Sequence, residues 1–113
     1  MTELDDFRER IRSAHYLFAE TLAFIAANYT YTPTEFTNGS LTSTAGQNEG
    51  SCKLLGLAQL EDLSVEETLQ AFGEHYRSVL NSPDGEDHGN IRALMKSGLA
   101  GVSFNSPPLT RKH

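Results

Sequence analysis

The hydrophobic pattern of this chain changes its period near Tyr29, and this change constrains the fold more than any other feature. Before Tyr29, apolar residues recur at steps of three and four, which places them on one side of a helix. The recurring residues are Leu4, Phe7, Ile11, Ala14, Phe18, Leu22 and Ile25. This stripe predicts helical structure over residues 3–28, either as one helix or as two helices broken near 13–16.

After Tyr29 the sequence favours strands. Residues 29–37 are rich in β-branched and aromatic side chains, and a second such run follows Asn38-Gly39. Asn-Gly between two β-prone runs is the strongest short-range signal of a hairpin. Pro33 has no N–H group to donate to a ladder, so its strand is expected to lie at an edge or to break there. A further short strand is predicted over 101–105.

Three helices are predicted between the hairpin and the last strand. The first follows a polar, glycine-bearing loop at 45–50 and is expected over about 51–60. The second begins at the capping box Ser64-Val-Glu-Glu67, in which each side chain accepts a hydrogen bond from the other residue's backbone N–H. Its apolar face consists of Val65, Leu69, Phe72, Tyr76 and Val79. The third is capped by Asp87, and Gly98 suits the position just after its end.

Together these elements predict an α+β fold with four or five helices packed on a small antiparallel sheet. The sheet would combine the hairpin 29–44 with the C-terminal strand 101–105. A length of 113 residues leaves room for one domain, expected over 1–113. The basic C-terminal residues 111–113 are expected to fray.

Composition excludes several classes of function. Fifteen acidic residues against nine basic ones give a net charge of −6, which disfavours nucleic acid and anionic membranes as partners. One cysteine excludes an intramolecular disulfide and a zinc site built from several thiolates. The first residues show neither the basic region nor the apolar core of a signal peptide, so a cytoplasmic location is expected.

The acidic residues are concentrated between residues 48 and 90. This segment holds nine acidic and two basic residues. The acidic ones are Glu49, Glu61, Asp62, Glu66, Glu67, Glu74, Asp84, Glu86 and Asp87. They are either solvated helix faces and caps or a docking surface for a basic protein partner.

Cys52 is the candidate for covalent chemistry. It falls in the first turn of a predicted helix, where the helix dipole lowers the pKa of a thiol. His88 would then serve as general base, Asn90 would orient its imidazole, and Gln47 would donate to an oxyanion. The alternative is an inert cysteine that packs the helix, and the sequence leaves both interpretations open.

Metal and phosphate motifs are incomplete. His15, His75 and His88 could join an acidic side chain at a metal, but no pair has the His-x-x-x-His spacing of a helical site. The segment 84–95 lacks the glutamate that closes a calcium loop. Residues 46–53 lack the Gly-Lys-Ser/Thr end of a Walker loop, although an anion could rest on this helix N-terminus beside Lys53. We therefore predict neither a metal nor a cofactor.

The polar loop before Cys52 is a candidate binding surface. Asn38, Asn48, Glu49, Ser51 and Lys53 gather between the hairpin and the next helix. Loops held on a rigid scaffold often carry binding function, and they equally often cap their own helix.

Several motifs resemble the HopJ type III effector family over about residues 18–110. They are Phe36-Thr-Asn-Gly39, Gly46-Gln-Asn-Glu-Gly-Ser-Cys-Lys53, Phe72-Gly73, Tyr76-Arg77, Asp87-His-Gly-Asn-Ile-Arg92 and Gly98-Leu-Ala-Gly101. The resemblance implies a HopJ-type bacterial protein. The family is named after candidate effectors injected by plant-pathogenic bacteria, and it has no established biochemical activity.

The two functional hypotheses differ in chemistry. No complete catalytic constellation can be assembled from the sequence, so the leading one is a non-catalytic protein-binding domain or a type III effector-like protein. The alternative is a small Cys/His-dependent hydrolase or transferase with Cys52 as nucleophile. The expected location is the cytoplasm, and the alternative is secretion into a host cell by a type III system.

Overall fold

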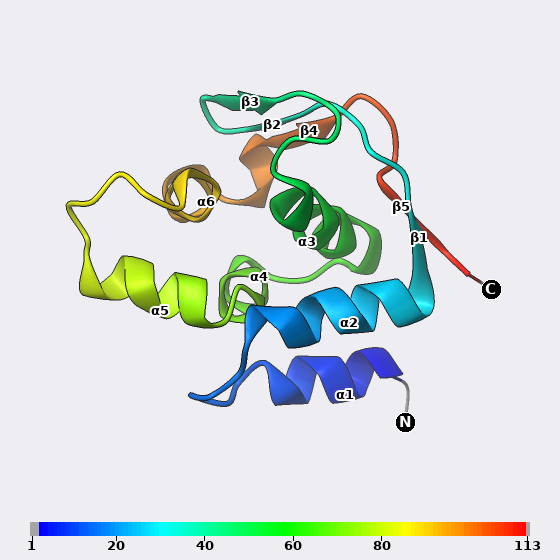
Figure 1. The fold of residues 1–113 in the computed structure, drawn as a ribbon, viewed down its shortest axis with the longest axis horizontal. Coiled ribbons are helices and arrows are strands. Elements are labelled where there is room, and N and C mark those ends of the chain that lie inside the picture. Colours follow the sequence, from blue (N-terminus) through cyan, green and yellow to red (C-terminus); the bar gives the residue numbers. More distant parts are fainter. Residues whose placement is uncertain (1–2, 113) are drawn as a thin grey trace.

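A computed structural model of the protein describes residues 3–112. Helices lie in layers beneath a small sheet (Figure 1). The helices are α1 (Glu3–Arg10), α2 (Phe18–Asn28), α3 (Glu49–Glu61), α4 (Val65–Ala71), α5 (Glu74–Asn81) and α6 (Gly89–Ser97), and a 3₁₀ turn covers Leu99–Gly101. The strands are β1 (Tyr29–Tyr31), β2 (Phe36–Asn38), β3 (Leu41–Ser43), β4 (Val102–Phe104) and β5 (Leu109–Arg111). This is the predicted α+β class.

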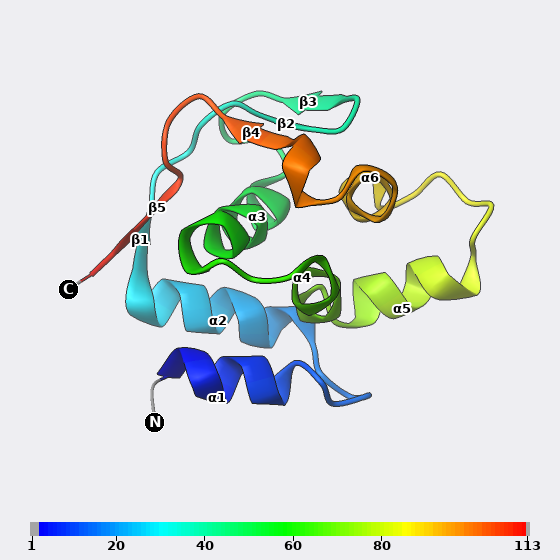
Figure 2. The same ribbon diagram turned by 180° about the vertical axis from the view of Figure 1, so that it is seen from behind.

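The N-terminal stripe forms two helices rather than one. Between α1 and α2 the chain turns back, so the two helices run antiparallel, side by side (Figures 1 and 2). Phe7 of α1 stacks on Phe24 of α2, with ring centroids 4.5 Å apart. Glu20 accepts the backbone N–H of Leu17 at 3.0 Å, which fixes the start of α2. Of the two predicted alternatives, the broken helix is confirmed.

The hairpin is shorter than predicted. β2 pairs with β3 around Gly39, which has a φ of 61°, and β4 pairs with the other side of β2. The prediction that the hairpin begins at residue 29 is wrong, because β1 leaves this sheet before Pro33 and pairs instead with β5. The expected fraying of the C-terminal residues is also wrong for Arg111, which closes this ladder and forms an ion pair with Glu61 at 2.6 Å.

Helix α3 lies at the centre of the molecule, between the sheet and α2 (Figures 1 and 2). It begins at Glu49, before the predicted start near residue 51. Several of its faces are buried: Leu54, Leu55 and Leu57 are inaccessible, and Ala58 is almost so. Because it packs on more than one side, its ends decide which polar side chains reach the surface.

The predicted helix after Ser64 is two helices. Its capping box is confirmed, since the Glu67 carboxylate accepts the N–H of Ser64 at 2.9 Å and the Ser64 hydroxyl accepts the N–H of Glu67 at 3.0 Å. The chain then breaks at Gly73, whose φ is 61° and whose added Cβ would lie 2.5 Å from the backbone nitrogen of Phe18. The apolar face continues across the break because α4 and α5 pack on the same core, so its periodicity does not reveal the corner.

The N-cap of helix α6 lies one residue later than predicted. His88, not Asp87, is the N-cap residue, and the carboxylate of Asp87 accepts a hydrogen bond from Arg92 at 2.7 Å instead. Gly98 follows the helix with a φ of 68°, as predicted. In the described part of the chain, no helix is long and apolar enough to span a membrane.

Candidate functional site

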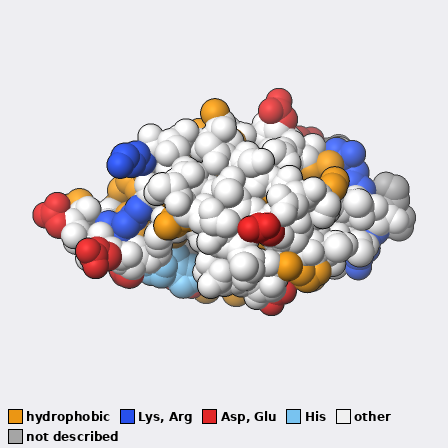
Figure 3. Space-filling model, turned by 90° about the horizontal axis from the view of Figure 1, so that it is seen from above, with side chains coloured by type: hydrophobic (Ala, Val, Ile, Leu, Met, Phe, Trp, Pro, Cys, Tyr) orange, Lys and Arg blue, Asp and Glu red, His pale blue; other side chains and the backbone are white. Residues whose placement is uncertain are grey.

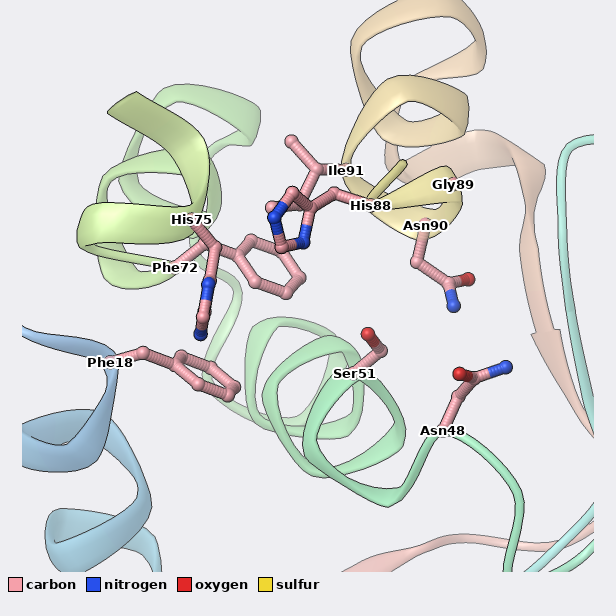
Figure 4. A pocket seen from close by; sticks show the side chains of 9 residues that line it. All are labelled: Phe18, Asn48, Ser51, Phe72, His75, His88, Gly89, Asn90 and Ile91. Atoms are coloured by element: carbon pink, nitrogen blue, oxygen red, sulfur yellow. The ribbon is translucent and has the colours of Figure 1, made fainter. Parts of the chain in front are cut away.

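A pocket of about 290 Å³ opens where α3, α5 and α6 meet the start of α2 (Figure 4). Polar and aromatic side chains surround it. Its lining residues are Phe18, Asn48, Ser51, Phe72, His75, His88, Gly89, Asn90 and Ile91. The volume is at the lower end of the range for small-molecule sites.

Two helix N-termini face this pocket, and both begin in the same way. Asn48 precedes α3 and His88 precedes α6, each in the left-handed conformation with a φ of 53°. Neither residue caps its helix with a side-chain hydrogen bond. The N–H groups of a first turn have no partner within the helix, and they form its electropositive end. The pocket therefore has two sets of N–H groups available to a ligand.

Asn90 is the most confined polar side chain of the pocket. It is 8% exposed. Its Oδ1 accepts a hydrogen bond from Nδ2 of the fully buried Asn38 at 3.0 Å. This contact fixes the amide so that its own Nδ2 points across the pocket toward Asn48 (Figure 4). That Nδ2 donates no hydrogen bond to any residue that the structure describes, and it is not sealed from solvent, so it is open to a ligand or to water.

Two imidazoles form the opposite wall. The rings of His75 and His88 lie 5.0 Å apart between centroids, and Phe18 packs edge-on against His75 at 5.4 Å. Glu74 holds this wall in place, because its carboxylate accepts the backbone N–H of Phe18 at 2.7 Å. Histidine side chains form a pale-blue patch on the molecular surface (Figure 3). Both imidazoles of the pocket wall are partly exposed, that of His88 by 32%.

Cys52 lies on a different side of α3. Its side chain is 1% exposed and does not line the pocket. It lies against the Tyr31 hydroxyl and the backbone of Thr34, and burial raises the pKa of the thiol although both contacts oppose this rise. A buried thiol with a raised pKa is a poor nucleophile.

The predicted catalytic residues are therefore divided. His88 and Asn90 line the pocket, whereas Cys52 and Gln47 do not. Gln47 accepts the N–H of Thr44 at 3.1 Å, which closes its own loop. This arrangement does not favour the Cys/His hydrolase or transferase.

The predicted binding residues also separate into two groups. Asn48 and Ser51 line the pocket, and Asn38 lies behind it in contact with Asn90. Glu49 and Lys53 lie on the Tyr31 side of α3, where the Lys53 ammonium is 4.9 Å from the ring centroid.

The remaining charged groups give no metal centre in the part of the chain described, residues 3–112. No group of three or more His, Cys, Asp or Glu side chains is arranged there to hold an ion. Among the acidic residues of 48–90, Glu61, Glu67 and Asp87 form ion pairs with arginines of the same chain. Acidic side chains are scattered over the face in Figure 3 rather than gathered. A basic protein partner stays a prediction.

Sequence reasoning did not assign Phe18, Phe72 or Ile91 to a site. Phe72 and Ile91 belong to motifs that carry the family resemblance, and those motifs could have identified them as candidate site residues. Phe18 was assigned to the core stripe, and its stacking on Phe72, with centroids 5.5 Å apart, agrees with a partly structural role.

The fold and the pocket define an α+β protein with a polar, ligand-sized site between two helix N-termini. The family model described as HopJ type III effector protein matches residues 4–109, and the chain belongs to that family. The chain is also similar to a solved structure, the crystal structure of unknown function protein VPA0580. The two share 40% identity and a TM-score of 0.90, over 98% of this chain and 95% of the other. No curated protein matches the chain.

Proposed function

We propose that the protein is a non-catalytic binding domain that holds its ligand in the pocket between α3, α5 and α6. The observation that carries this proposal is the Nδ2 group of Asn90, which is confined, directed into the pocket by Asn38 and without a partner in the described structure. Because this group is held in place and open to the pocket, a ligand can accept its hydrogen bond in place of water.

The absence of an activated nucleophile supports binding rather than catalysis. Ser51 is the hydroxyl-bearing residue of the pocket lining. Nucleophilic catalysis by serine needs a base within hydrogen-bond reach of the hydroxyl, and the described residues give Ser51 no side-chain hydrogen bond. The thiol of Cys52 is buried elsewhere.

The family description supports action inside a host cell. Type III effectors are delivered into a host cell, so we extend the proposal to a ligand met after delivery. A translocation reporter fused to this chain should give a signal in host cells that depends on the type III apparatus. A reporter that stays in the producing bacterium would contradict delivery and leave the binding site unaffected.

A thermal-shift screen tests the binding function. A panel of small metabolites is added to the protein and to Ser51→Gln, whose longer side chain extends from α3 into the pocket. Ser78→Gln, the same change at an exposed position of α5, is the control. Ligand at one hundred times its dissociation constant stabilises a protein by about 2.7 kcal/mol. We expect this stabilisation in the protein and in Ser78→Gln, but not in Ser51→Gln, with the ligand recovered unchanged.

Two results would overturn the proposal. One is a panel in which stabilising compounds act equally on Ser51→Gln. The other is chemical conversion of a bound compound that Cys52→Ala abolishes, which would restore the hydrolase or transferase hypothesis.

A further inference from the structure

The geometry points to a small oxyanion, a carboxylate or a phosphate, as the class of ligand. This inference rests on the proposed function and names the chemistry that the same pocket would recognise. It depends on which groups reach the pocket and on which nearby charges are already paired.

Hydrogen-bond donors predominate around the pocket. Nδ2 of Asn90 and the hydroxyl of Ser51 lie on facing walls (Figure 4). Gly89 and Asn90 are the first two residues of α6, so their N–H groups have no helical acceptor. α3 contributes a second uncapped first turn at the same pocket. Donors that approach from two helices match an acceptor-rich group such as an oxyanion.

The electrostatics of the pocket also favour an anion. Its lining contains neither aspartate nor glutamate within the described chain. Two carboxylates beside the lining already hold hydrogen bonds, because Glu74 accepts the N–H of Phe18 and Asp87, which lies 3.8 Å from Nε2 of His88, is bonded to Arg92. Glu49, the first residue of α3, lies on the Tyr31 side of that helix. α3 and α6 have 13 and 9 residues, long enough for each to place partial positive charge at its N-terminus. An anion between them would meet two electropositive ends.

The Oδ1 atom of Asn48, a hydrogen-bond acceptor on the lining, narrows the expected chemistry of the ligand. Nδ2 of Asn48 donates to Ser43 at 3.0 Å, so its Oδ1 faces the pocket side (Figure 4). This oxygen would accept a hydrogen bond from the ligand. Hydrogen phosphate, or an acid that carries a hydroxyl group, supplies both kinds of group.

An NMR titration of the ¹⁵N-labelled protein at constant ionic strength tests the inference. The probes are inorganic phosphate, sodium acetate and acetamide, which has nearly the shape of acetate without its charge. We expect phosphate and acetate to shift the amide signals of Ser51, Gly89 and Asn90 saturably, and acetamide to leave them unmoved.

Variants place the effect at the pocket. Asn90→Asp keeps an oxygen for Asn38 but replaces Nδ2 with a carboxylate oxygen, and it should weaken phosphate binding about tenfold or more. Asn81→Asp adds the same charge at the exposed end of α5 and should bind phosphate normally. If Asn90→Asp does not fold, Ser51→Ala removes a donor at a half-buried position and should weaken binding severalfold.

The outcomes separate this inference from the proposed function. Equal shifts with acetate and acetamide would show a neutral polar ligand, which overturns the oxyanion and leaves the binding pocket standing. Equal weakening in Asn90→Asp and Asn81→Asp would reveal only long-range charge, and it also overturns the oxyanion site. If no anion shifts the pocket amides, the inference fails, and the metabolite screen decides the proposed function independently.

Discussion

Ser51 and Cys52 are neighbours on α3 and have opposite surroundings. Successive residues of a helix are about 100° apart around its axis, so Ser51 faces the open pocket while Cys52 faces Tyr31. On the Ser51 side, the Nδ2 group of Asn90 donates no hydrogen bond within the described chain. On the Cys52 side, the thiol is 1% exposed and packed. One short motif therefore builds a site with one face and anchors the central helix with the other.

On the Cys52 side of α3, the side chains are kept from solvent by packing rather than held by hydrogen bonds. The Tyr31 hydroxyl approaches the Cys52 thiol and the Glu49 carboxylate, but it has no hydrogen bond of regular geometry. Burial raises the pKa of Tyr31, so its hydroxyl stays protonated. The Ser51 and Cys52 sides of α3 therefore differ in their access to solvent, and substitutions on each side can test this difference.

The largest expected effect is at Gly73, which forms the corner that brings Phe72 and His75 to the pocket. Gly73→Ala would place a Cβ in a left-handed conformation and 2.5 Å from the backbone of Phe18. We expect a loss of about 3 kcal/mol in the free energy of unfolding, measured with urea. Gly46→Ala is the control, because its φ is 85° but nothing lies within 4 Å. Equal losses would show that sterics at the corner contribute nothing.

A paired substitution on α3 tests the comparison directly. Cys52→Ser replaces the thiol with a smaller and more polar hydroxyl at a site closed to solvent and should lower the free energy of unfolding by about 2 kcal/mol. Ser51→Ala, one residue away, should change it by less than about 0.5 kcal/mol because the pocket is open. Chemical denaturation of both variants measures the difference. Equal effects would mean that the two sides of α3 are equally packed.

The smallest predicted effect is at the far end of α3, where Glu61 bonds Arg111 and also accepts a hydrogen bond from Tyr29. The Arg111 guanidinium holds the pKa of Glu61 below its ordinary value of 4.5. A lowered folded-state pKa contributes stability above the ordinary pKa, and this contribution is lost as the pH falls below it. Glu61→Gln should therefore lose less stability than the unchanged protein when the pH falls from about 6 to about 3, across the ordinary pKa of glutamate.

Urea unfolding at several pH values measures this effect, with the exposed Glu9→Gln as control. An unchanged acid sensitivity in Glu61→Gln would contradict the role of the Arg111 pair.

Local signals predicted much of this fold. The capping box at Ser64, the glycine after α6 and the hairpin near Asn38-Gly39 each depend on a few adjacent residues. The break at Pro33 was one of two predicted alternatives, and the structure confirms it, since β1 ends at Tyr31 and β2 begins at Phe36. The break at residues 72–73 was harder, because the apolar periodicity continues across it. The pairing of β1 with β5 joins distant segments, and nothing in either segment specifies its partner.

The pocket illustrates the same limit. Asn48, Ser51, His88 and Asn90 were each singled out in the sequence, but as members of separate hypotheses. Their meeting depends on the packing of α6 against α4, α5 and the sheet, and on the left-handed start at His88. Histidine in that conformation has no local signature comparable to that of glycine.

The left-handed starts of α3 and α6 have a consequence for engineering. Glycine adopts this conformation without the steric cost that asparagine and histidine carry. A library of variants selected for heat resistance alone should therefore become enriched in glycine at positions 48 and 88. Such variants would lose the Asn48 amide and the His88 imidazole, so thermal robustness and the proposed ligand recognition would make opposite demands on the same two residues.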